Sequence, residues 1–428
     1  MKTLVILLIL IISSYGYTID AGLKKQYETY IDNFYKENQN GPGSYILSTA
    51  TDDDSKTITV SEAIGYGMLI TAHMNDKDRY DELYAFFKKY QQPNKLMQWE
   101  VYDDGTADSG SATDGDLDIA YSLLIASEKW GNKYKDEAVE MIDAIWENEM
   151  FTDAEDIVPA CGDTWEEEAE YNKSSYTRPS DWMPGHFRAF SLVSDYNWDA
   201  AVDGVYNFNK KYRNSSTGLV PDFFKGFKPG PANGIETKHD GDYYYNACRV
   251  PLRFAMDRGS SRGGEAKEKI YSFFDRKYNG DMFEIKAGYS LSGDEIKKYN
   301  EWSFISPVIS AGYFDQDEWD ELSTIDQEEA FSAAINILSM LVVSNKWIVP
   351  TPKLSISTLQ KKHSIKYTLK NKTLTLYQEA KTIRIYNLHG ALIYSKNISN
   401  PVINLTFLVP GRYLCKIDKY VLKLNISK

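Results

Sequence analysis

The chain of 428 residues is too long for one average domain, and 43% of its residues are hydrophobic, enough to bury a sizeable core. Its net charge of −13 is unevenly divided, because the segment from Pro352 onward holds 14 Lys and Arg against 2 Asp and Glu. That segment carries +12 and everything before it −25. The five histidines form no i, i+4 pair and the three cysteines stand singly, so spacing supports neither a metal site nor a dense disulfide framework. Either a Cys161–Cys248 bridge or three buried free thiols fits the sequence.

Residues 1–17 have the pattern of a cleaved signal peptide. Lys2 precedes an apolar run from Leu4 to Ile12, and small residues follow. We therefore expect a secreted or cell-surface protein. No later apolar run approaches the ~20 residues that span a bilayer, so we expect no membrane embedding of the mature form.

Residues 18–348 carry mostly helical signals. Apolar side chains recur at i, i+3, i+4 and i+7 in several segments, for example from Leu83 to Tyr90 and from Leu117 to Leu124. Long loops rich in Gly, Pro, Asp and Trp, such as 98–111 and 222–242, lie between them. This pattern predicts a mainly α barrel of paired helices, with the long loops gathered at one end to form a site.

Residues 349–354 include Pro350 and Pro352, which mark a linker. From residue 355 to residue 428 apolar and polar residues alternate, as in the stretch around Tyr413, Cys415 and Ile417. We expect a small C-terminal all-β sandwich here.

Two separated groups of acids stand out in the helical region. Glu62 lies in a Gly- and Tyr-rich apolar setting, and Asp114, Asp116 and Asp118 follow one another at an expected helix start. The row of aspartates could simply cap a helix. Acids in such different surroundings instead suggest acid and base chemistry on a sugar. The aromatic content of 14% fits a carbohydrate-binding cleft, although the tyrosines could equally be structural.

Four sequence blocks occur in the order and approximate spacing of glycoside hydrolase family 8, which this chain resembles over roughly residues 20–348. The blocks are Ser61–Met68, Ala112–Ala120, Arg178–Met183 with His186–Phe190, and Tyr243–Pro251. The resemblance implies an (α/α)6 barrel with an acidic, aromatic-lined cleft and hydrolysis with inversion at the anomeric carbon. We expect neither a cofactor nor a metal.

The resemblance assigns the general acid to Glu62. Its carboxyl group must hold a proton, and an apolar aromatic pocket built partly by Tyr66 would supply the raised pKa that this requires. Ala63 departs from the family, which usually has Gly there. Asp114 matches a position that in relatives is catalytic or grips the sugar at the cleavage point, and we count it among the catalytic residues, with the role of holding and distorting that ring. Asp116 and Asp118 are expected to be capping or supporting groups.

Many relatives carry Asp at the position of the base, where this chain has Asn246. An amide cannot take a proton from water, so Asn246 is ruled out as the base. A subgroup with Asn at this position has a Glu in the preceding loop, and Glu236 falls there, with Asp240 and Asp242 as weaker candidates. An inverting pair leaves room for water, so the carboxyls of Glu62 and Glu236 should lie about 6.5 to 9.5 Å apart.

Further residues are expected to bind substrate or line the cleft. Trp99 and Trp182 are candidates for sugar stacking, with an ordinary core position as the alternative for each. Arg249 and Arg178 are expected to fix carboxylates more than to touch substrate. The full set of expected substrate-binding residues is Trp99, Tyr66, Trp182, Tyr245, Arg249 and Asn246.

The basic C-terminal segment fits three interpretations. Its Asn387–Gly390 turn and its Pro410–Tyr413 stretch resemble the C-terminal sorting domain of type IX bacterial secretion, which would make secretion machinery a partner. A carbohydrate-binding module and a plain stabilising β-domain are the alternatives. No nucleic-acid-binding motif occurs in it, so we expect no nucleic-acid partner.

Together these features predict a secreted, inverting endo-β-1,4-glucanase acting on cellulose-type or mixed-linkage β-glucan. An endo-xylanase or a chitosanase with the same mechanism remains an alternative. So does a non-catalytic glycan-binding protein on the same barrel, against which the acid at Glu236 argues.

Overall fold

The computed structural model describes residues 21–48, 56–153, 156–163, 176–351, 366–377, 380–386, 392–418 and 420–426. The expected signal peptide, residues 352–354 of the expected linker and the Asn387–Gly390 turn lie outside these residues. The chain divides into two compact units, Met1–Pro350 and Thr351–Lys428, and each has its own hydrophobic core. Cys161, Cys248 and Cys415 are free thiols and all are buried, which decides between the two alternatives left by the sequence.

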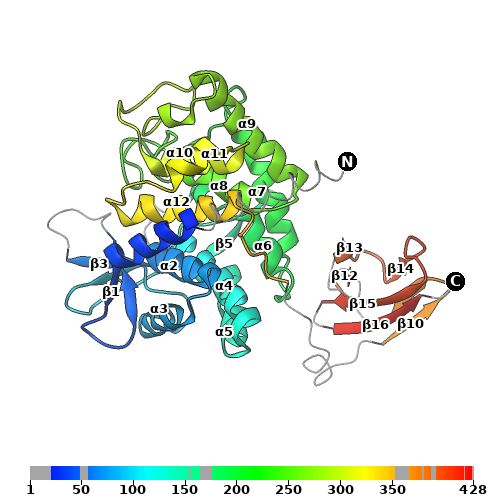
Figure 1. Ribbon diagram of the computed structural model, residues 1–428. Helices are drawn as coiled ribbons and strands as arrows, with labels where there is room; N and C mark the ends of the chain where they lie inside the picture. Colours follow the sequence, from blue (N-terminus) through cyan, green and yellow to red (C-terminus); the bar gives the residue numbers. More distant parts are fainter. Residues whose placement is uncertain are drawn as a thin grey trace, which may run out of the picture. The chain divides into compact units, whose positions relative to one another are not determined.

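Unit 1 is an (α/α)6 barrel, as expected (Figure 1). Its inner helices pack in sequence, each on the next, and the last returns to the first, so that the ring closes. The inner helices among the described residues are α2 (Ser61–Met74), α4 (Thr113–Trp130), α6 (Pro184–Phe190), α8 (Val250–Met256), α10 (Trp302–Ala311) and α12 (Ala330–Val343).

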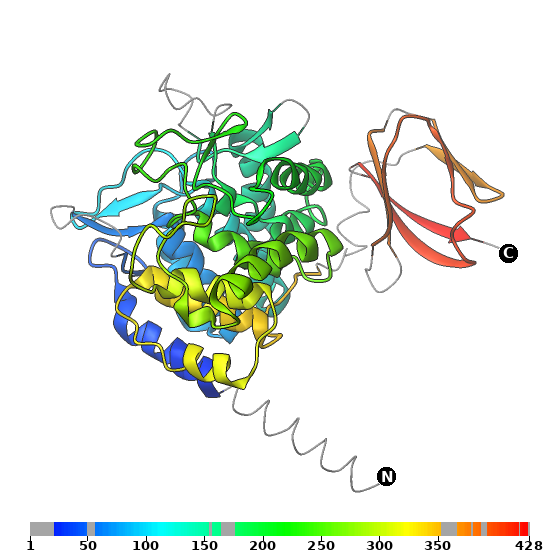
Figure 2. The same cartoon turned by 90° about the horizontal axis from the view of Figure 1, so that it is seen from above.

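An outer helix packs on most of these inner helices, as Figure 2 shows from above. The outer helices among the described residues are α3 (Lys77–Lys89), α5 (Lys133–Glu149), α7 (Trp198–Tyr212), α9 (Ser261–Tyr278) and α11 (Gln316–Leu322). Residues 21–34 are also helical. The two layers differ in sequence: α12 is apolar or small nearly all round and is buried, whereas α3 buries one stripe of Tyr80, Leu83, Phe86 and Phe87.

Helices α2 and α4 approach so closely that only glycine fits at two positions of their contact. A Cβ atom on Gly65 would lie 2.9 Å from Cβ of Asp118 and 3.0 Å from the carbonyl oxygen of Gly115. A Cβ atom on Gly115 would lie 2.6 Å from the carbonyl carbon of Ser61. The N-terminal ends of the two helices, which carry Glu62 and Asp114, are therefore held together by direct backbone contact.

Short strands and 3-10 turns precede several inner helices. Strand β3 (Thr57–Val60) leads into α2 and pairs with β4 (Glu100–Tyr102), with Val60 opposite Glu100. The backbone N–H of Ser61 donates to the carbonyl oxygen of Trp99 over 2.8 Å. The other such elements are β1 (Tyr35–Glu37), β2 (Ser44–Ile46), β5 (Met150–Asp153), β6 (Asp156–Pro159), β7 (Tyr176–Thr177), β8 (Phe224–Lys225), β9 (Lys228–Pro229), η1 (Pro179–Asp181), η2 (Ala247–Arg249) and η3 (Met282–Glu284).

Unit 2 is built from two antiparallel sheets that enclose one core, which includes Leu374, Ile385 and Cys415. The first sheet has the order β10 (Tyr367–Lys370), β11 (Thr373–Leu376), β14 (Val402–Asn404). The second has the order β13 (Leu392–Asn397), β12 (Thr382–Tyr386), β15 (Gly411–Ile417), β16 (Tyr420–Ile426). Ile385 pairs with Cys415 across β12 and β15, in keeping with the alternation seen in the sequence.

Candidate active site

Glu62 lies in the first turn of α2 with 19% of its side chain exposed. The Tyr66 hydroxyl, one turn further along the helix, donates to its Oε1 over 2.9 Å, and Nη1 of Arg249 contacts the same oxygen. A small recess beside the carboxyl group is lined largely by apolar side chains, among them Ile46 and Phe331. The surroundings are thus apolar on one side, as expected, but a phenol and a guanidinium contact the carboxyl on the other.

Asp114 is buried at the start of α4 between two arginines. Its Oδ1 lies 2.8 Å from Nη2 of Arg178, and its Oδ2 accepts from Nη1 of Arg249 over 2.8 Å. The backbone N–H of Gly115 donates to Oδ1 over 2.9 Å. The position of this carboxylate is therefore fixed from three directions.

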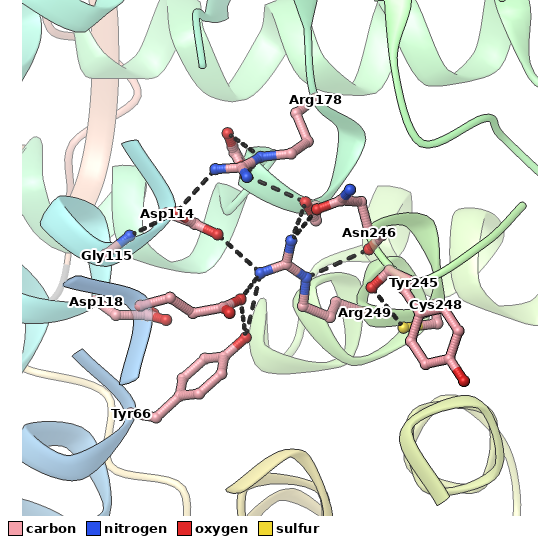
Figure 3. Close-up of polar contacts among 12 residues, drawn as sticks. Tyr66, Asp114, Gly115, Asp118, Arg178, Tyr245, Asn246, Cys248 and Arg249 are labelled. Carbon is pink, nitrogen blue, oxygen red and sulfur yellow. Dashed lines mark hydrogen bonds and ion pairs between the residues drawn. The ribbon is translucent and has the colours of Figure 1, made fainter. Parts of the chain in front are cut away.

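Arg249 lies at the centre of the polar contacts in Figure 3. Besides the two carboxylates, its Nη2 donates to the hydroxyl of Ser180 over 2.9 Å and to Oδ1 of Asn246 over 2.7 Å. Arg249 is 2% exposed and so belongs to the framework of the site. Its contacts with Glu62 and Asp114 are those of a residue that fixes carboxylates, and its part in binding substrate stays a prediction.

Glu236 lies in the loop before α8, where Nδ2 of Asn246 donates to its Oε2 over 2.8 Å. The residue keeps access to solvent, yet the protein around it dehydrates the carboxylate and raises its pKa above the ordinary value, an effect that Arg178 and Asn246 oppose. The carboxyl groups of Glu62 and Glu236 are thus connected through Arg249 and Asn246. Their separation stays a prediction.

The weaker candidates for the base have structural partners. Asp240 is buried, and its carboxylate accepts from the backbone N–H groups of Ile235 and Thr237 over 2.6 and 2.7 Å, which holds the Glu236 loop in place. Asp242 lies 2.9 Å from Nδ1 of His239. Glu236 is the acid in this loop whose carboxylate accepts from the side-chain amide of Asn246.

The two tryptophans expected to stack on sugar, Trp99 and Trp182, differ in exposure. Trp99 is 37% exposed and neighbours the start of α2 through its bond to Ser61. Trp182 is fully buried, packs against Phe208 and Phe224 and donates to Thr177, so the stacking role expected for it is wrong and it is a core residue.

The two tyrosines expected to bind substrate, Tyr66 and Tyr245, differ in exposure. Tyr66 is 2% exposed and acts on Glu62. Its hydroxyl therefore supports the acid, and its expected contact with substrate stays a prediction. Tyr245 is partly exposed, and its hydroxyl lies 3.1 Å from that of Tyr299, whose side chain is also exposed.

One supporting cluster went unrecognised in the sequence. Arg253 of α8 donates to both oxygens of Asp118 over 2.9 and 2.8 Å, and Nε2 of His186 lies 2.9 Å from Oδ1. Burial opposes the charge on Asp118, but Arg253 and His186 outweigh it and lower its pKa. The sequence carries no local signal for this cluster, because Asp118, His186 and Arg253 lie on three different inner helices.

Among the described residues, no group of three or more His, Cys, Asp or Glu side chains is arranged to hold a metal ion. None of the helices described there has the length and apolar character needed to cross a membrane.

Carboxylates held in place by buried arginines at the helix starts of a helical barrel fit a glycoside hydrolase, which uses a pair of acids on the sugar. Residues 6–322 match the family model described as Glycosyl hydrolases family 8, so the chain belongs to this family.

Individual proteins agree with that assignment. An endoglucanase of Bacillus sp. (strain KSM-330) is 35% identical over 371 residues, covering 78% of each chain. The apo structure of a β-1,3-1,4-glucanase from Paenibacillus sp. X4 matches with a TM-score of 0.71 and 29% identity, covering 78% of this chain and 94% of that one. A reducing-end-xylose-releasing exo-oligoxylanase complexed with xylose matches with a TM-score of 0.64 over 78% of this chain and 95% of that one, and its 19% identity shows a shared fold alone.

Proposed function

We propose that this family 8 hydrolase is an endo-β-1,4-glucanase that cleaves cellulose-type or mixed-linkage β-glucan with inversion. The observation that carries the assignment of the base is the hydrogen bond from the Asn246 amide to Glu236. Asn246 cannot itself take a proton from water, but this bond places the carboxylate of Glu236 beside it. The names of the endoglucanase and glucanase relatives support the substrate class.

In the proposed mechanism, Glu62 donates its proton to the glycosidic oxygen as the bond to the anomeric carbon breaks. Glu236 takes a proton from a water molecule, whose oxygen attacks the anomeric carbon from the opposite face. The raised pKa of Glu236 strengthens it as a base, because a more basic carboxylate binds the proton of the attacking water better. The products are two sugar chains, one with a new reducing end of inverted configuration.

Asp114 holds the sugar ring at the cleavage point in this proposal. Arg178 and Arg249 keep its carboxylate oriented, and a fixed negative charge favours the positive charge that develops on the ring. Exposed Trp99, next to the start of α2, offers a face on which a sugar can stack.

The test compares Glu62→Gln and Glu236→Gln with wild type on soluble β-glucan. We expect kcat to fall by about 10²- to 10⁴-fold in each variant. Glu265→Gln is the matched control, because Glu265 lies on the outer helix α9 with 54% of its side chain exposed. NMR of the first product should show the α-anomer. Wild-type rates in both variants, or a first product with the β-anomer, would contradict the mechanism.

The alternatives are distinguished by substrate. Product profiles on cellulose, lichenan, xylan and chitosan separate the proposed glucanase from a xylanase or chitosanase. A glycan-binding protein without activity would retain substrate binding and release no product from any of the four.

We also propose that the protein is exported through residues 1–17 and that unit 2 resembles a sorting domain for type IX secretion. The support is the sequence pattern of both segments, including Pro410, which directly precedes β15. Expression in a host with that secretion system, with and without residues 352–428, tests this. Equal export of both chains would contradict a sorting role.

A further inference from the structure

Two buried carboxyl groups meet beneath the start of α4. Asp116 lies two residues after Asp114, and Glu149 is the last residue of α5; both are completely buried. Oδ1 of Asp116 accepts from the backbone N–H of Met97 over 2.9 Å, and Oε1 of Glu149 accepts from the hydroxyl of Ser111 over 2.6 Å. Each carboxyl thus has one oxygen bound to a donor of the surrounding protein.

The remaining oxygens, Oδ2 of Asp116 and Oε2 of Glu149, are buried and form no hydrogen bond with another described residue. The Thr113 hydroxyl, which is also buried, lies close enough to Glu149 to donate to it, but Oδ2 of Asp116 has no such neighbour in the described ranges. The two side chains lie within hydrogen-bonding reach of each other. Two carboxylates cannot donate to each other, so a bond between them needs a proton on one. A buried polar atom without a partner is unfavourable, and a shared proton gives both oxygens a partner at once.

Among the residues that the structure describes, none brings a positive charge that could replace that proton. Asp163, in the loop after β6, adds a negative charge that raises the pKa of both carboxyl groups. Its own oxygens accept from the backbone N–H of Ser111 over 2.8 Å and from the side-chain amide of Asn94 over 2.7 Å. Within the described part of the chain, no Lys, Arg or His forms an ion pair with Asp116, Glu149 or Asp163, and the three do not form a metal site.

We propose that Asp116 and Glu149 share a proton, and that this pair positions the first turn of α4 and hence Asp114. The inference rests on the proposed function only in giving Asp114 a role in hydrolysis. The bond from Met97 to Asp116 also ties α4 to the segment that carries Trp99, which is bound in turn to Ser61 next to Glu62. Asp116 is thus connected by hydrogen bonds to the segment of Trp99 and, through it, to the start of α2.

A shared proton makes the stability of the folded protein depend on pH. Burial and the neighbouring acid raise the pKa of Asp116, and burial raises the pKa of Glu149 to about 7. In the unfolded chain both groups release their protons near pH 4. Above about pH 4 the folded state therefore binds more protons than the unfolded state. Its stability falls as the pH rises from there through about 7, the pKa of Glu149, and through the raised pKa of Asp116. Loss of the last proton leaves two adjacent buried negative charges under Asp114.

The test uses Glu149→Gln and Asp116→Asn in the full chain, because an amide can donate the bond that the shared proton makes. Glu140→Gln is the matched control, since Glu140 lies on α5 too and has 55% of its side chain exposed. We expect the Tm of wild type and control to fall by several degrees between about pH 5 and pH 9, and the Tm of the two amide variants to fall less. The alkaline limb of kcat for β-glucan hydrolysis should move to higher pH in the amide variants.

A second measurement does not depend on activity. Infrared spectra of wild type at neutral pH should contain the carbonyl stretch of a protonated carboxylic acid, which Glu149→Gln removes and Glu140→Gln keeps. Absence of that band in wild type, or identical Tm slopes in wild type and both amide variants, would overturn the proposal. If wild type hydrolyses no β-glucan, the proposed function is wrong. The dependence of Tm on pH and the infrared band then still test whether Asp116 and Glu149 share a proton. If neither amide variant folds, absence of the band in wild type would still overturn the proposal.

Discussion

The side chain of Asn246 binds Glu236 and Arg249 at the same time: its amide donates to Glu236 over 2.8 Å, and its oxygen accepts from Arg249 over 2.7 Å. An aspartate in this place could accept from Arg249 but, when ionised, could not donate to Glu236. Asparagine here therefore removes one possible base and orients another.

The first prediction follows from that donation, which lowers the pKa of Glu236. In Asn246→Ala the pKa of Glu236 should rise. A base is active when ionised, so the acidic limb of the kcat/KM profile should move to higher pH, by about one unit. Asn207→Ala, at an exposed position on α7, serves as control and should leave the limb in place. An unchanged limb in Asn246→Ala would show that Glu236 is not the group that titrates.

The second prediction contrasts two tryptophans. Trp99→Ala should raise KM for β-glucan by roughly threefold to tenfold with little change in Tm, because an exposed stacking surface is lost. Trp182→Ala should instead destabilise the fold by about 3–5 kcal/mol, because it empties a core position. Kinetics and thermal unfolding of both variants check this, and the reverse assignment of the two effects would refute it.

The third prediction concerns the buried ion pair of Asp118 and Arg253. Asp118→Asn removes one charge and leaves the other buried, which should cost about 3–5 kcal/mol in the free energy of unfolding. Glu140→Gln, which breaks the exposed pair with Lys95, should cost less than about 1 kcal/mol. Urea unfolding of the two variants measures the difference, and similar losses would mean that burial does not govern this pair.

The fourth prediction is that unit 1 is active by itself. A chain that ends after Pro350 should keep kcat within about twofold of the full protein, because each unit has its own core. A chain that ends after Ser344 should unfold at lower temperature. It lacks Trp347, whose ring centroid lies 4.4 Å from that of His73 and 5.5 Å from that of Tyr121. Equal Tm values for the two truncated chains would contradict the importance of this stack.

Sequence reasoning reached the barrel because one-sided helices such as α3 show the helical period plainly and because four motifs resembled one family. It was less informative for α12, which is buried nearly all round and has no polar face to set a period. It could not tell Trp99 from Trp182, since exposure depends on contacts with Phe208 and Phe224 far along the chain.

Within the site, the sequence indicated the acids but not how they are supported. The partnership of Asp116 with Glu149 joins residues 33 positions apart that no shared motif connects. Asp118 was expected only to cap or support, and its bonds to Arg253 and His186 come from two other inner helices. Such contacts arise from closure of the ring and have no local signature.

The glycine contact between α2 and α4 has a bearing on engineering. Since main-chain atoms touch there, the distance between the backbone at Glu62 and the backbone at Asp114 is set by the crossing of two helices. A library aimed at a different polysaccharide is best confined to loops 98–111 and 222–242, with Trp99, Ser111, Glu236 and Asp240 kept unchanged. Diversity at Gly65 or Gly115 would yield chains that no longer assemble the reaction centre at all.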